Sequence, residues 1–206
     1  MTKLDPKRPP CYELFFALLQ VVLDPTQYER VQFAYFASKY GHAGQIRDDG
    51  SRYFDHPKAA AWIYMSELNG RDPDVIIDIL LHDLSEDQYL LSPYRITLNF
   101  GKDTALDMRA ITKLPKGKET TEEYLNRVIA RGLRVILAKL CDRLHNIRNL
   151  TSCSADKRQH QLEETSEYHL KMLIPELRKH DGIWLTYGNA MEVMFRQAMA
   201  LYNTSP

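Results

Sequence analysis

Apolar residues recur along most of this chain at the three- and four-residue spacing of amphipathic helices. No segment alternates convincingly at the two-residue period of a strand, although short strands remain an alternative between Gly44 and Tyr53. Pro57 and Pro73 suit the first turn of a helix, and Asp72 suits an N-cap. The pattern predicts an all-α protein with helices near Tyr12–Leu23, Gln27–Tyr40, Pro57–Leu68, Pro73–Glu86, Asp103–Thr112, Thr121–Ala130, Leu133–Asn149, Lys157–Lys179 and Tyr187–Tyr202.

Length and charge narrow the class of protein. The 206 residues are enough for one domain with a full core. The 27 Lys and Arg residues balance 27 Asp and Glu residues, so no basic tail indicates duplex nucleic acid. Cys11, Cys141 and Cys153 are an odd set without metal-type spacing, which indicates reduced thiols in a cytoplasmic protein.

The apolar stretch Leu14–Leu23 superficially resembles a signal peptide because basic residues precede it. However, Asp5 and Glu13 interrupt the approach, and Asp24-Pro25 stands in place of a small-residue cleavage site. The stretch is also too short to span a bilayer. We therefore expect an amphipathic first helix and no membrane association.

The most informative chemistry follows the largely apolar run Val75–Leu81. His82 and Asp83 come directly after it, and Glu86 and Asp87 come one helical turn later. Adjacent imidazole and carboxylate groups on a buried helix can bind one metal, and residues four apart share a helix face. Four ionisable groups beside such a run are costly to bury without a metal or a partner. The segment predicts metal-assisted hydrolysis, with Glu86 and Asp87 orienting or deprotonating the attacking water.

Two further candidate metal ligands lie far away in the sequence. His56 begins a predicted helix, and Asp142 lies within the predicted helix Leu133–Asn149. With His82 and Asp83 they give two imidazoles and two carboxylates, a set that suits Mn²⁺, Fe²⁺ or Zn²⁺ in a catalytic role. A role as a core histidine or in an ion pair would explain each residue alone, but four independent structural roles are a less plausible explanation of the whole set than one metal site.

Arg47 is a candidate nucleotide contact in a second segment, which runs from His42 to Pro57. Its planar cation can stack on a base or bind phosphate. The alternative is a surface salt bridge with Asp48 or Asp49.

The helix that carries Asp142 offers another polar candidate. Asn146 lies one turn beyond Asp142, where it can hydrogen-bond a ribose or base or make only a local helix contact. His145 and Arg148 are expected to point elsewhere on the helix and to serve structure.

These residues belong to blocks that resemble the HD-type hydrolase domain of the RelA/SpoT-homologue family, specifically its stand-alone small alarmone hydrolases. The blocks are HAGQIR with GSRYFDHP, LLHDLSED, FGKDTALDMRAITKL and LAKLCDRLHNIRNL, in the family's order. The resemblance implies a single-domain HD-type helical bundle of about nine or ten helices. We expect an N-terminal helix in residues 1–25, the hydrolase domain in 26–180, and a C-terminal helix in 181–206 packed on it.

The resemblance also implies an activity. The family removes the 3′-pyrophosphate from guanosine tetra- and pentaphosphate to give GDP or GTP, usually with Mn²⁺. Its metal ligands fall on His56, His82, Asp83 and Asp142, its water-activating pair on Glu86 and Asp87, and its nucleotide-contacting positions on Arg47, Asn146 and Asn149. The length of the chain predicts degradation without synthesis.

Departures from the family pattern lie near the expected nucleotide site. Asp48 and Asp49 stand where a basic and a small polar residue are common, Arg52 replaces a Pro, and Asn149 replaces a Thr. Two extra acids repel a phosphate-rich ligand unless they contact its base or sugar. An adenosine-type alarmone or NADPH therefore remains an alternative substrate.

A different class of function is an interaction protein, for instance an antitoxin that neutralises a small synthetase toxin. A binding module would not need the full ligand set, which argues against this function alone. The segment Met191–Tyr202 carries Met and aromatic residues at helical spacing, and core packing is its default interpretation. A homodimer or partner surface is the alternative.

Overall fold

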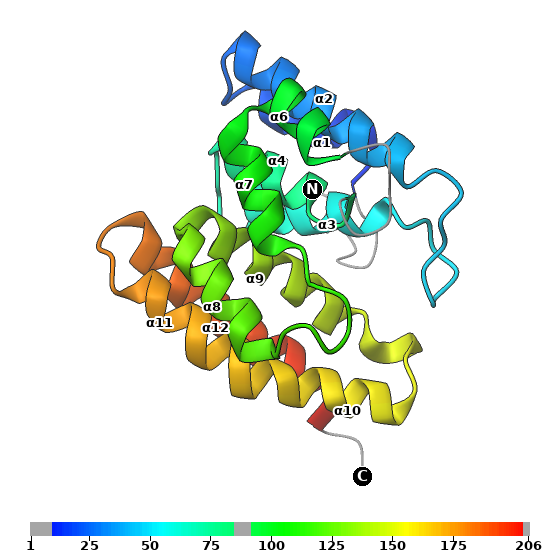
Figure 1. The fold of residues 1–206 in the computed structure, drawn as a ribbon, viewed down its shortest axis with the longest axis vertical. Helices are drawn as coiled ribbons and strands as arrows, with labels where there is room; N and C mark the ends of the chain where they lie inside the picture. Colours follow the sequence, from blue (N-terminus) through cyan, green and yellow to red (C-terminus); the bar gives the residue numbers. More distant parts are fainter. Residues whose placement is uncertain (1–9, 85–91, 204–206) are drawn as a thin grey trace.

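The computed structural model describes residues 10–84 and 92–203 (Figure 1). Within these ranges every regular element is a helix, and the segment where short strands were an alternative holds only an isolated antiparallel bridge between Ile46 and Arg52. The predicted all-α class is therefore confirmed.

Helices make up most of both described ranges. The first range contains α1 (Tyr12–Gln20), α2 (Pro25–Gly41), α3 (Asp55–Trp62), its π-helical continuation η1 (Ile63–Glu67) and α4 (Pro73–Leu81). The second contains α6 (Pro93–Phe100), α7 (Lys102–Ile111), α8 (Thr121–Arg131), α9 (Leu133–Arg148), the 3₁₀-helix η3 (Leu150–Ser152), α10 (Ala155–Glu164), the π-helix η4 (Thr165–His169), α11 (Leu170–Arg178) and α12 (Ile183–Asn203).

Three elements differ from the sequence predictions. Helix α6 was not predicted, although Ser92 caps it and Pro93 occupies its first turn. Helix α4 ends at Leu81, so His82 and Asp83 lie in a turn and not inside a helix. The predicted helix Lys157–Lys179 is interrupted by the π-helical turn η4, which joins α10 to α11.

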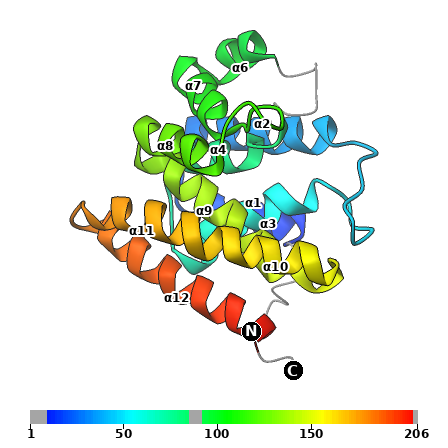
Figure 2. The same ribbon diagram turned by 60° about the horizontal axis from the view of Figure 1, so that its bottom comes forward.

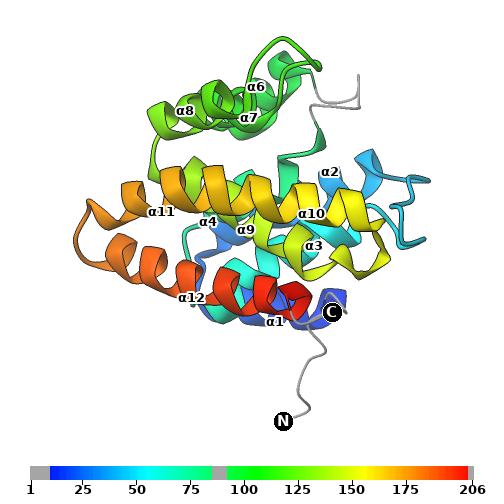
Figure 3. The ribbon, with the colours of Figure 1, turned by 90° about the horizontal axis from the view of Figure 1, so that it is seen from below.

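Helices α4 and α9 form the centre of the fold. Helix α4 packs against α2, α3, α7 and α9, and its residues from Val75 to Leu81 are all buried. Helix α9 also contacts α3, α8, α11 and α12. In Figures 2 and 3, α6, α7 and α8 lie on one side of α9, and α12 lies on the other. This arrangement fixes α3, α4 and α9 against one another, and these elements carry the site.

A single glycine allows the abrupt change of direction between α8 and α9. Gly132 is the only residue between these helices, and its φ of 121° lies in the region that favours glycine. Helix α9 can therefore start at Leu133 and run through the core.

The three cysteines are free thiols, as expected. Among the described helices, none combines the length and apolar character needed to cross a membrane.

Candidate active site

The structure brings together the four predicted metal ligands from three packed elements. His56 lies in the first turn of α3, His82 and Asp83 follow α4, and Asp142 lies in α9. Helices α3, α4 and α9 contact one another in all three pairs. The arrangement depends on the apolar faces of these helices, which bury His56, His82 and Asp142 almost completely.

The polar atoms of these side chains converge on one point. His56 Nε2 lies 3.0 Å from Asp142 Oδ1 and 3.5 Å from Asp83 Oδ2. His82 Nε2 lies 3.1 Å from Asp83 Oδ1 and 3.4 Å from Asp142 Oδ1. One ligand atom from each of His56, His82 and Asp83 lies within 4.8 Å of the others. Two nitrogen and two carboxylate ligands at this spacing fit a divalent cation such as Mn²⁺, Fe²⁺ or Zn²⁺.

Neighbouring groups orient the ligands toward this point. His82 Nδ1 donates to the Ile79 carbonyl at 2.7 Å, which leaves the Nε2 lone pair facing the centre. Tyr53 donates to Asp83 Oδ2 at 3.1 Å. Asp142 Oδ2 accepts from Lys139 Nζ at 2.7 Å.

The electrostatics of the cluster favour a bound cation. Burial disfavours the charge of Asp142, yet Lys139 and His82 keep its pKa well below the usual value. Burial likewise opposes the charge of Asp83, but the nearby imidazoles lower its pKa. Burial lowers the pKa of His56, whereas the two carboxylates raise the pKa of His82 despite its burial. One buried and one partly buried carboxylate therefore remain anionic and need positive charge beside them.

His145 does not line the cavity, but it contacts one of the candidate ligands from behind. Its Nδ1 lies 2.7 Å from His56 Nδ1, on the side of the His56 ring that faces away from the ligand cluster. Position 145 follows Asp142 by three residues, which already places it on the same helix face. The sequence pattern also did not single out Lys139, although it precedes Asp142 by three residues and therefore lies on the same helix face. Arg148 pairs with Glu67 through both carboxylate oxygens and serves structure, as expected.

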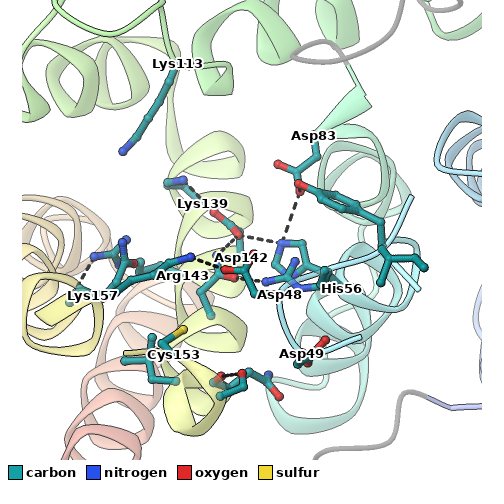
Figure 4. A pocket seen from close by; sticks show the side chains of 18 residues that line it. Asp48, Asp49, His56, Asp83, Lys113, Lys139, Asp142, Arg143, Cys153 and Lys157 are labelled. Carbon is teal, nitrogen blue, oxygen red and sulfur yellow. Dashed lines mark hydrogen bonds and ion pairs between the residues drawn. The ribbon is translucent and has the colours of Figure 1, made fainter. Parts of the chain in front are cut away.

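A cavity of about 380 Å³ opens beside the cluster and reaches His56, Asp83 and Asp142. Figure 4 shows three cationic side chains on one side of it, opposite His56 and Asp83. These are Lys113, Lys139 and Arg143. A space of this size, with cationic side chains along one side and carboxylates of the candidate metal cluster on the other, suits a small anionic ligand that binds together with a cation.

Arg47 and Asn146 lie side by side in the cavity wall. Arg47 Nη2 donates to Asn146 Oδ1 at 2.8 Å, and the guanidinium lies 5.6 Å from the centre of the Tyr53 ring. The alternative interaction of Arg47, a surface salt bridge with Asp48 or Asp49, is not formed in the structure. Asp48 instead forms an ion pair with Lys157 on α10, and Asp49 accepts from the backbone and hydroxyl of Ser51.

Asn149 also borders the cavity, but both contacts of its amide nitrogen go to His145. Asn149 Nδ2 lies 2.7 Å from the His145 carbonyl oxygen and 3.2 Å from His145 Nε2. Its predicted role as a nucleotide contact stays a prediction. The predicted water-activating pair, Glu86 and Asp87, lies outside the described residues.

The comparison with known protein families gives the class of this chain. Residues 34–169 match the family profile described as HD domain, and the chain belongs to this family. The similarity also extends to particular curated proteins.

The Escherichia coli K12 protein "Bifunctional (p)ppGpp synthase/hydrolase SpoT" is 35% identical over 202 residues, which cover 89% of this chain and 28% of that protein. An Aquifex aeolicus "Guanosine-3′,5′-bis(diphosphate) 3′-pyrophosphohydrolase" is 36% identical over 165 residues, covering 78% of this chain and 23% of that protein. The chain therefore spans less than a third of the length of these relatives.

A solved structure has the same fold. It comes from work titled "A metazoan ortholog of SpoT hydrolyzes ppGpp and plays a role in starvation responses". It superposes with a TM-score of 0.64 at 23% identity and covers 85% of this chain and 96% of its own. The two chains therefore share one helical fold over most of their lengths.

Proposed function

We propose that this chain is a metal-dependent 3′-pyrophosphohydrolase that converts guanosine tetraphosphate and pentaphosphate to GDP or GTP and pyrophosphate. The observation that carries the proposal is the convergence of His56, His82, Asp83 and Asp142 beside a cavity that has cationic side chains along one side. The printed names of the E. coli and A. aeolicus relatives support this choice of substrate.

The four ligands would hold one divalent cation, and Mn²⁺ is the cation we propose. When bound, such a cation polarises phosphoryl oxygens and increases the acidity of water. Lys139 holds Asp142 as an anion turned toward the other ligands, and Tyr53 does the same for one oxygen of Asp83. These contacts fix the ligand geometry before substrate arrives, which avoids reorganisation during the reaction.

The cavity offers separate contacts for the two ends of the substrate. On one side we assign the phosphate groups to three cations, of which Lys113 and Arg143 share Glu164 as counter-ion and Lys139 pairs with Asp142. On the other, we assign the nucleoside to Arg47 and Asn146, which present a guanidinium plane and an amide.

We retain Glu86 and Asp87 as the residues that orient and deprotonate water. This assignment rests on their carboxylates and on their position three and four residues after Asp83 in the sequence.

Product analysis tests the proposal. Purified protein with Mn²⁺ is incubated separately with guanosine 3′,5′-bis(diphosphate), its adenosine counterpart and NADPH, and the products are separated. We expect GDP and intact pyrophosphate from the guanosine substrate at the highest kcat/KM. Orthophosphate released from NADPH, or faster turnover of the adenosine compound, would refute the substrate assignment.

A pair of histidine variants shows whether the turnover comes from this site. His82→Ala removes a ligand, whereas His160→Ala removes an exposed histidine on α10. We expect activity to be lost only in the first variant. Equal activity in both would contradict the assignment of the cluster as the active site.

A further inference from the structure

The amide orientation of Asn149 follows from a single contact. Its terminal atom lies 2.7 Å from the carbonyl oxygen of His145, and a carbonyl oxygen can only accept. That atom is therefore the Nδ2 donor. The same Nδ2 lies 3.2 Å from His145 Nε2, so it meets the lone pair of that ring nitrogen.

This orientation determines where the ring hydrogens of two histidines lie. If His145 Nε2 accepts, the hydrogen of its neutral ring is on Nδ1. His145 Nδ1 then donates to His56 Nδ1 across 2.7 Å. The hydrogen of the His56 ring is consequently on Nε2, where it donates to Asp142 Oδ1 at 3.0 Å.

A cation at the cluster requires the opposite arrangement. Binding through His56 Nε2 uses the lone pair of that atom, so its hydrogen must be on Nδ1 and donate to His145. The hydrogen of His145 must then be on Nε2, where it faces the Nδ2 donor of Asn149. Two donors 3.2 Å apart repel, and Asn149 would have to turn its oxygen toward the ring.

We propose that His145 and Asn149 are positioning residues that set the affinity of the His56 site for a divalent cation. The proposal rests on the metal-dependent function above. His145 supports the His56 ring, while the amide of Asn149 favours the arrangement in which His56 Nε2 carries a hydrogen and thus weakens cation binding. Asn149 is thereby assigned to metal affinity and not to nucleotide contact.

The exchange of hydrogens leaves the net charge of the chain unchanged. Cation binding releases the hydrogen of His56 Nε2 to solvent as a proton. The hydrogen on His145 Nδ1 moves to His56 Nδ1, and His145 Nε2 takes up one proton from solvent. Each imidazole remains neutral before and after the exchange.

Titration of the protein with Mn²⁺ alone, without nucleotide, tests the proposal. The signal of free Mn²⁺ in electron paramagnetic resonance gives the dissociation constant directly and independently of catalysis. Asn149→Asp replaces the amide with a carboxylate that accepts from His145 Nε2, so we expect Mn²⁺ to bind about tenfold more tightly. Ser152→Asp is the matched control, because it adds the same charge at the same end of the cavity without a contact to His145.

Substitutions at His145 distinguish an effect that passes along the hydrogen bonds from Asn149 through His145 to His56, which we call the relay, from an effect of added charge alone. His145→Gln retains an oxygen that can accept from His56 Nδ1, whereas His145→Phe retains none, so we expect Phe to weaken Mn²⁺ binding about tenfold and Gln to weaken it less. In the His145→Phe background, Asn149→Asp should increase the affinity for Mn²⁺ no more than Ser152→Asp does. Circular dichroism of the metal-free variants confirms that each is folded.

The possible failures are distinguishable. If wild-type protein binds Mn²⁺ but Asn149→Asp gains no more affinity than Ser152→Asp, the relay is refuted and the proposed metal centre stands. An Asn149→Asp gain that persists in the His145→Phe background also refutes the relay. If wild-type protein binds no Mn²⁺ or other divalent cation, the proposed metal centre and the relay both fail.

Discussion

A buried ion pair between α9 and the end of α10 gives the sharpest stability prediction. Arg143 Nη2 lies 2.9 Å from Glu164 Oε2, and Arg143 Nε donates to Thr165 Oγ1 at 2.7 Å. Both partners are less than 10% exposed. Glu164→Gln keeps the volume and an acceptor oxygen but leaves the guanidinium buried without a counter-charge.

The size of the effect follows from the pKa of Glu164. Burial works against the charge, yet Arg143 and, more weakly, Lys113 and His169 lower this pKa to about 2 from its ordinary 4.5. That difference corresponds to about 3 kcal/mol of folding free energy, which screening by solvent from the cavity side reduces to about 2 kcal/mol. Because the pKa is lowered in the fold, the stabilisation is complete above pH 4.5 and disappears as the pH falls toward 2.

Urea denaturation of wild type and Glu164→Gln between pH 7 and pH 3 checks this prediction. We expect a deficit of about 2 kcal/mol at pH 7 that narrows below pH 4.5. Glu167→Gln is the control, because Glu167 pairs with Lys171 on the exposed surface and should contribute less than about 1 kcal/mol. Equal stability of the two variants at pH 7, or a deficit independent of pH, would refute the reasoning.

Three further predictions follow from local geometry. Gly70→Ala should cost about 1–3 kcal/mol in urea denaturation, because its Cβ would lie 2.1 Å from a Tyr64 ring atom; unchanged stability contradicts this. Lys157→Ala leaves the carboxylate of Asp48 without its counter-ion at the cavity, so KM for the anionic substrate should rise about two- to fivefold. Asp48→Ala should instead lower this KM, and a shift of KM in the same direction in both variants would refute the electrostatic reason. Burial lowers the pKa of His169 to about 3, so stability should fall as pH drops below 6.5, and His169→Leu should remove this slope in denaturation at successive pH values.

The sequence was sufficient to predict the helical class and most helices, because their apolar faces recur at helical spacing. It was also sufficient to select His56, His82, Asp83 and Asp142, since each polar group stands within or beside an apolar segment that the core must bury. The structure places these four groups together, and their assignment as metal ligands is supported by that geometry.

Features that depend on contacts between distant segments were not predictable in the same way. The position of His145 against His56 depends on how α9 packs on α3, and its spacing from Asp142 was the only local signal. The Asp48–Lys157 pair joins residues 109 positions apart, which no local pattern reveals. The end of α4 at Leu81 was hidden because the polar positions after it continue the helical spacing.

The central claim is that hydrolysis depends on a divalent cation held by two imidazoles and two carboxylates. Its most direct test is the rate of pyrophosphate release from guanosine 3′,5′-bis(diphosphate) before chelation, after chelation, and after addition of Mn²⁺ to the chelated protein. We predict that chelation abolishes the release and that Mn²⁺ restores it in wild type but not in Asp142→Asn. An undiminished rate in the fully chelated protein would contradict the account.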